Sequence, residues 1–182
     1  MAFEQIRLDR PLSRIEIAML VIVISVCVVW LLQRLAYLEA VAEARALDLT
    51  LRNIRTGIMV NVATRLIQSD DQGIASLAGT NPVGTVIDAP QGYIGVLRDA
   101  NPDFIQPGQW YFDEERKALV YHVVNADYTE RAGEGPTRLR VSLKLSYDDR
   151  NGNDTYDPGI DMPSGVSLNI LEPLKWTFQG NR

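Results

Sequence analysis

The sequence predicts an α+β fold in which one long N-terminal helix packs on an antiparallel sheet of four or five strands. Three observations predict it. No proline interrupts residues 12–68, and apolar residues recur at helical spacing in the second half of that segment. From Trp110 onward, the apolar residues instead follow a period of two, which is typical of strands. A chain of 182 residues has room for one such domain and a further segment.

The first strong feature is an uncharged run over Ile17–Leu32, with the sequence IAMLVIVISVCVVWLL. At about 1.5 Å per residue the run covers roughly 24 Å, and apolar neighbours extend it toward the ~30 Å of a bilayer core. The run has no polar face, which argues against a buried core helix. It also has no small-residue cleavage site, which argues against a cleaved signal. We therefore predict a single transmembrane helix over residues 15–38.

The charges around this run predict its orientation. The basic residues before it are Arg7, Arg10 and Arg14. Arg34 and Arg45 follow it, but among acidic residues. The positive-inside rule then makes residues 1–14 a cytoplasmic tail and residues 39–182 a periplasmic domain, anchored in the inner membrane. The one cysteine, Cys27, lies inside the run, so the domain has no intrachain disulfide.

Beyond the run, the helix becomes amphipathic. Its apolar stripe consists of Leu47, Leu51, Ile54, Ile58, Val62 and Leu66, which follow each other at steps of three and four. We predict a continuous helix that ends at about residue 68, roughly 80 Å long. Its stripe is the expected cover for the apolar face of the sheet.

Residues 69–108 are rich in glycine and proline and predict an ordered loop with one short strand at most. The sheet is expected over residues 109–179. Its predicted strands are Trp110–Asp113, Ala118–Val124, Arg138–Tyr147, a segment containing Val166, Leu168 and Ile170, and a short strand with Trp176 and Phe178. Alternation within Trp110–Phe112 predicts that one or two of the three aromatic rings are buried. His122 is expected to be an ordinary strand residue, because the chain has no second histidine and no cysteine outside the apolar run to complete a zinc site.

The start of the long helix has the sequence Arg10-Pro11-Leu12-Ser13-Arg14-Ile15-Glu16, followed by IAMLVIVISV. This start, with a long helix on an antiparallel sheet, resembles the type IV pilins and the type II secretion pseudopilins. Glu16 matches the glutamate that opens the hydrophobic run in that family, and Ser13 stands where threonine is usual. The segments Pro107–Asp113 and Leu119–Tyr121 also look like sheet segments of minor pilin-like proteins.

The chain departs from the family pattern at the cleavage point. Pro11 replaces the glycine that prepilin peptidase requires, and Leu12 replaces the usual aromatic residue. The resemblance therefore implies an uncleaved, pilin-like accessory protein of a type IV pilus or a type II secretion system. Its implied partners are the membrane, pilin-like or pseudopilin subunits, and proteins of the assembly platform.

The alternative is a bitopic periplasmic binding or sensor module, calcium-dependent or not, that is unrelated to pili. An enzyme is not expected, because no catalytic constellation is visible, and no small-molecule substrate is predicted. A net charge of −5 supplies no basic surface for a nucleic acid.

Ser13 and Glu16 have two interpretations. Their spacing is that of a capping box, in which each side chain bonds the backbone N–H of the other. The resemblance implies instead that Glu16 neutralises the N-terminal amine of a neighbouring subunit. Both interpretations stay open at this stage.

The second candidate site is the acidic segment Tyr147–Pro163, with the sequence YDDRNGNDTYDPGIDMP. Oxygen ligands at alternate positions suit calcium. Asp149, Asn151 and Asn153 match the opening of an EF-hand loop. Two later positions depart from it, because Asp154 occupies the place of the turn glycine and Ile160 that of the final glutamate. The other interpretation is a solvated hairpin loop, because Asp, Asn and Gly also form turns. The candidate calcium ligands are Asp149, Asn151, Asn153, Thr155 (through its backbone carbonyl), Asp157 and Asp161.

Overall fold

The structure is a computed structural model of the chain, and it describes residues 13–98, 100–101, 104–130 and 136–178. The predicted tail up to Leu12, with Pro11 and the arginines at positions 7 and 10, lies outside the described residues. The internal contacts divide the chain into two compact units, Met1–Glu39 and Ala40–Arg182.

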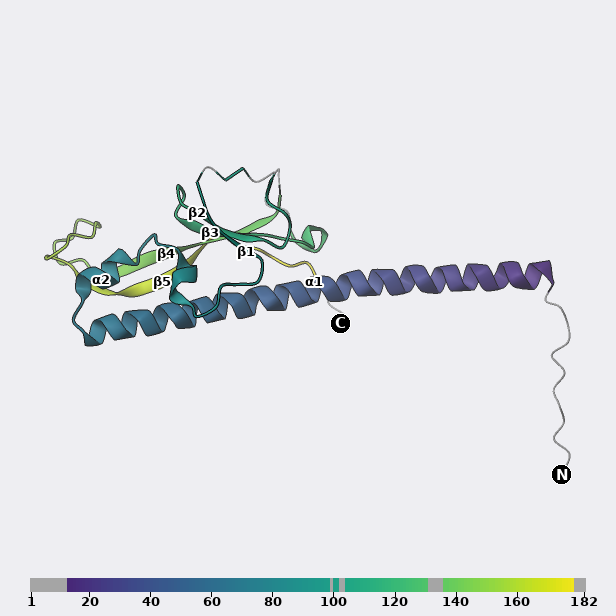
Figure 1. Cartoon of the computed structure of the whole chain (residues 1–182), viewed down its shortest axis with the longest axis horizontal. Coiled ribbons are helices and arrows are strands. Elements are labelled where there is room, and N and C mark those ends of the chain that lie inside the picture. The colour runs from purple at the N-terminus through teal and green to yellow at the C-terminus, as the bar shows by residue number, and fades with distance from the viewer. Residues whose placement is uncertain (1–12, 99, 102–103, 131–135, 179–182) are drawn as a thin grey trace, which may run out of the picture. The chain divides into compact units, whose positions relative to one another are not determined.

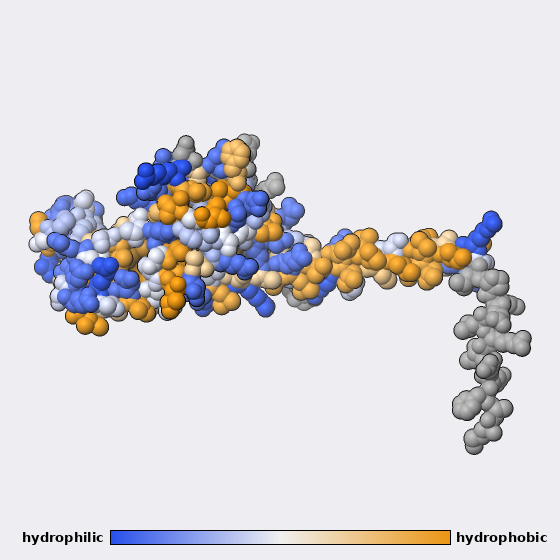
Figure 2. Space-filling view, viewed as in Figure 1, coloured by the Kyte–Doolittle hydropathy of each residue, from blue (hydrophilic) through white to orange (hydrophobic). Residues whose placement is uncertain are grey.

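Helix α1 runs without interruption from Arg14 to Ile67, which confirms the single long helix (Figure 1). In the first unit, no described residue of this helix is buried. Apolar side chains cover the helix there on the side shown in Figure 2. By its length and composition, α1 is able to span a membrane near the N-terminus of the chain.

The second unit contains a five-stranded sheet in the order β1-β2-β3-β4-β5. Only β1 and β2 pair in parallel, and the other neighbours are antiparallel. Packing of α1 on this sheet confirms the predicted α+β fold. The strands are β1 (Tyr93–Leu97), β2 (Trp110–Asp113), β3 (Ala118–His122), β4 (Arg138–Asp148) and β5 (Met162–Glu172).

The connection between α1 and β2 holds more structure than the sequence predicted. The short strand β1 is present, and two short helices precede it: α2 (Asp71–Ser76) and the 3-10 helix η1 (Pro82–Thr85). Each begins at a polar cap. A carboxylate oxygen of Asp70 accepts from the Gly73 N–H at 2.8 Å, and the Asn81 side chain accepts from the Val83 N–H at 3.1 Å. These caps explain how a segment rich in glycine forms helical turns.

The predicted final strand is not formed. Trp176 makes a single bridge to Thr129, and the rings of Trp176 and Phe178 stack with their centroids 5.5 Å apart. On one side of Thr129 the opposing backbone forms the 3-10 helix η3 (Ala126–Tyr128), which is not extended. The prediction of a final strand was therefore wrong.

The main core lies between α1 and one face of the sheet. The α1 stripe contributes Leu47, Ile54, Ile58 and Val62 as buried residues. Leu66, which the sequence assigned to the same stripe, is 47% exposed. The sheet side of the core is formed by Trp110, Phe112, Leu119, Tyr121, Val123, Leu139, Val141 and Leu143.

A second, smaller core lies on the opposite face of β2 and β3. There Tyr111 packs with Ala118 and Val120 against partly buried residues of the segment that follows β1, including Ile105. All three rings of Trp110–Phe112 are therefore buried, rather than one or two. Alternation fails here because both faces of β2 are covered.

We predict that Ile54→Ala lowers the free energy of unfolding by about 2–5 kcal/mol, because it leaves a cavity in the main core. Ile54 is 1% exposed, whereas Leu49 on the same helix is 60% exposed. Leu49→Ala is the matched control and should change the unfolding free energy by less than about 0.5 kcal/mol. Urea unfolding followed by tryptophan fluorescence measures both, and equal effects of the two variants would contradict the packing described.

Candidate functional site

The start of α1 carries the first predicted site. The Ser13 N–H donates to Glu16 Oε2 at 2.7 Å, and the Glu16 N–H donates to Ser13 Oγ at 3.2 Å. This reciprocal pair confirms the capping box. Both residues are exposed, so the bonds also hold the carboxylate at the surface of the helix start. Contact between Glu16 and a partner chain stays a prediction.

The acidic segment is the loop between β4 and β5, and it is held together by its own hydrogen bonds. The carboxylate of Asp149 accepts from the N–H groups of Gly152 and Asp154, both at 2.8 Å. These backbone bonds, foremost the one from Asp154, hold the pKa of the Asp149 carboxyl below its usual value. Asp154 has a left-handed backbone (φ of 57°), the conformation that a glycine would take at this turn.

The other candidate calcium ligands are also engaged within the loop. Asn151 and Asn153 each donate a side-chain N–H to Asp157 Oδ2 at 2.7 Å. The Thr155 N–H donates to the Asn153 side-chain oxygen at 2.8 Å. Asp161 is 6% exposed, and it accepts from two backbone N–H groups of the loop, those of residues 150 and 157.

The arrangement of the loop does not resemble a preformed calcium shell. Among the described residues, no three His, Cys, Asp or Glu side chains are grouped to hold one metal ion. The structure brings the six candidate ligands into one loop, but as partners of each other and of the backbone. Calcium binding stays a prediction from the sequence.

Glu43, which the sequence patterns did not single out, makes four hydrogen bonds that join α1 to β3 and to the residues just after it. Its Oε1 accepts from the Tyr121 hydroxyl at 2.9 Å and from the Val124 N–H at 2.7 Å. Its Oε2 accepts from the backbone and side-chain N–H groups of Asn125, at 2.9 and 2.8 Å. Burial, and then the bond to Glu43, raise the pKa of Tyr121. The sequence holds one signal for Glu43. It lies four residues before Leu47, so a charged residue continues the buried stripe.

His122 is buried in the sheet. It is 2% exposed, and among the described residues its Nε2 has no hydrogen-bond partner. Its ring meets that of Tyr111 edge-on, with centroids 5.9 Å apart. Burial lowers the pKa of His122, and the positive charge of Arg138 lowers it further, against a hydrogen bond with the backbone of Ile105.

Comparison with known proteins assigns no family. No family model matches the chain, and no solved structure matches it. A segment of 97 residues, 53% of the chain, is 23% identical to a mandelamide hydrolase of Pseudomonas putida. The chain spans about a fifth of that protein's length (19%). At this identity and coverage, the similarity transfers no activity to the chain.

We predict that Glu43→Gln lowers the free energy of unfolding by about 2–4 kcal/mol. The amide keeps one acceptor but loses the charge, and it places an N–H group against existing donors. Glu39→Gln, an exposed change on the same helix, is the matched control and should have little effect. Denaturant titration measures both variants, and a Glu43→Gln protein as stable as the control would show that the four bonds contribute little.

We predict that stability falls as the pH drops below 6.5, the ordinary pKa of histidine, partly because of His122. In this range the unfolded chain binds a proton that the buried ring resists, so each pH unit removes up to about 1.4 kcal/mol until the lowered pKa is reached. His122→Gln removes this contribution and should flatten the dependence below about pH 6.5. Unfolding curves at several pH values test this, and parallel pH profiles for the two proteins would contradict it.

Proposed function

We propose that the protein is a pilin-like structural or assembly component of a type IV pilus or a type II secretion system. In this proposal α1 anchors the chain in the inner membrane, with the N-terminus in the cytoplasm and the second unit in the periplasm. The observation that carries it is the dual use of one uninterrupted helix. Its first part is apolar and exposed on all sides, and its second part is buried along one stripe by the sheet.

This dual use supports the proposal over the alternative of a domain on a simple anchor. A generic anchor ends where a separate domain or linker begins. Here Leu47, Ile54 and Ile58 belong to the same helix as the apolar run and are core residues of the sheet domain. One continuous helix therefore includes both the apolar run and core residues of the domain, which suits a protein that assembles through its helix.

Glu16 is the residue proposed to meet a partner in the membrane. Its carboxylate is exposed at the helix start and already bonds an N–H group of its own chain. The N-terminal amine of a neighbouring, processed subunit would supply a further donor and a compensating positive charge. A carboxylate at the membrane interface costs less free energy than one at the bilayer centre.

The proposal includes no catalytic activity. Among the described residues, His122 is buried and Cys27 lies in the apolar part of α1, so neither is placed to act on a soluble substrate. The partners proposed are pilin-like or pseudopilin subunits and proteins of the assembly platform. Neither a nucleic acid nor a small-molecule substrate is among them.

We predict that Glu16→Ala lowers pilus assembly or type II secretion at least about tenfold in cells that lack the natural protein. Replacing residues 17–32 with an unrelated leucine-rich span should have the same effect, because the helix surface is changed while the anchor remains. Glu39→Ala is the matched control. Membrane fractionation checks that every variant is present in equal amounts.

Full pilus assembly or secretion by both the Glu16→Ala protein and the protein with residues 17–32 replaced would refute the pilin-like role. Activity would then belong to the second unit alone, as expected for a bitopic binding or sensor module.

A further inference from the structure

We propose that the groove between α1 and β5 binds an extended segment of a partner protein, which adds as a strand to the outer edge of β5. The segment is apolar at alternate positions, acidic at its N-terminal end and basic at its C-terminal end. This inference concerns the second unit and does not require the pilin-like role.

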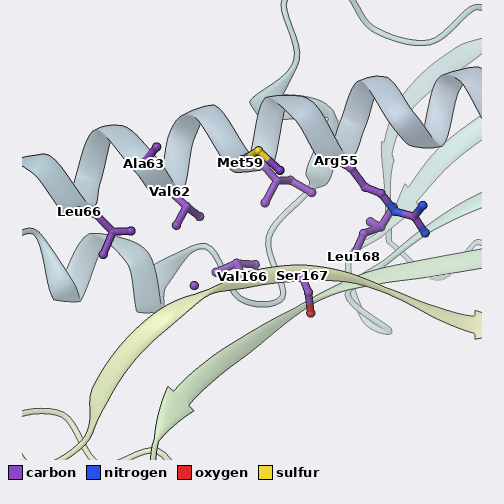
Figure 3. Close-up of a pocket in the computed structure, with 10 residues that line it drawn as sticks. Arg55, Met59, Val62, Ala63, Leu66, Val166, Ser167 and Leu168 are labelled. Carbon is purple, nitrogen blue, oxygen red and sulfur yellow. The ribbon is translucent and has the colours of Figure 1, made fainter.

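The groove is apolar and open to solvent. It has a volume of about 420 Å³, and its walls include Met59, Val62 and Leu66 of α1 and Val166 and Leu168 of β5. Val62 and Leu66 point from α1 toward β5, whereas Ser167 points away from the helix (Figure 3). Met59 is 71% exposed. These side chains would lose exposed apolar surface if an occupant filled the groove.

The edge of β5 beside this groove is unprotected. β5 is the last strand of the sheet, and no other described strand pairs with its outer edge. Residues 162–171 carry no charge, although charged side chains commonly block such edges. Pro163, near the start of the strand, is the one residue in this range that blocks pairing, because proline has no N–H group to donate to an added strand. From Val166 onward, the backbone can therefore pair with an added strand, while the groove receives alternate side chains.

Charges at the two ends of the groove select the direction of the occupant. Arg55 lines the end near Leu168. A second cavity, whose lining includes Ser69 and Met162, lies at the Met162 end of β5. The charged residues lining it are Asp70, Asp71, Asp161 and Arg150. Asp70 pairs with Arg65 at 3.1 Å, which leaves two aspartates against one arginine. Antiparallel pairing is the more stable geometry, and it places the C-terminal end of the occupant at the aspartates. A basic residue there and an acidic residue near Arg55 complement both ends.

A second copy of this chain fits less well than a separate partner. β5 has no basic residue between Met162 and Glu172, so β5 of a second copy would bring no positive charge to the aspartates. A segment of another protein can carry one.

The test uses the full chain in lipid nanodiscs and a fluorescent peptide, acetyl-Glu-Val-Thr-Val-Thr-Val-Arg-Arg-amide. We expect saturable binding by anisotropy that weakens with salt, and slower amide hydrogen exchange over residues 166–171. The same residues in reverse order should bind at least about fivefold more weakly, because both terminal charges then meet like charges.

Met59→Asp places a charge in the groove and should weaken peptide binding at least about tenfold. Leu49→Asp, at another exposed apolar position of α1, is the matched control and should leave binding unchanged. Equal melting temperatures of the two variants show that both remain folded.

Three results would overturn the proposal. The first is no binding of the forward peptide at 1 mM, and the second is binding that Met59→Asp does not weaken. The third is protection of residues 166–171 without peptide that grows with protein concentration, which would assign the edge to a second copy.

Discussion

The packing of one stripe of α1 on the apolar face of the sheet is the constraint on which the second unit depends. Val141 and Leu143 of the sheet would face water without the helix, and Ile54 and Ile58 would face water without the sheet. Apolar burial stabilises the fold strongly, but it does not fix the position of the helix along its own axis. A helix with apolar residues at every turn could slide by one turn and still cover the sheet.

Glu43 fixes the position of α1 along the sheet, which apolar packing alone does not. Its two oxygens accept from a side chain of β3, and from the backbone and the Asn125 side chain just after that strand. Hydrogen bonds to a carboxylate depend strongly on distance and angle, so a shift of α1 by one turn would break all four. The stripe thus supplies most of the attraction between helix and sheet, and Glu43 sets their register.

The same narrow stripe explains the groove. Met59 lies outside the stripe, and Leu66 lies beyond Val62, its last buried residue. Both therefore remain accessible beside an edge strand that has no charged residue from 162 to 171. In the proposed function, α1 meets partners in the membrane through its first part. The groove would give the second unit a separate contact, outside the membrane, with main-chain bonds for affinity and terminal charges for direction.

The sequence by itself determined the long helix, its apolar and amphipathic parts, and the hairpin and alternating strands. These are local patterns, because periods of 3.6 and 2 depend only on neighbours along the chain. The capping box at Ser13 and Glu16 was predictable for the same reason. Only the tertiary structure decided which side chains of distant segments meet. Glu43 bonds residues about eighty positions away, Tyr111 is buried by the segment after β1, and Trp176 finds a single extended partner. Such contacts depend on how elements are placed in space, and no local period records that placement.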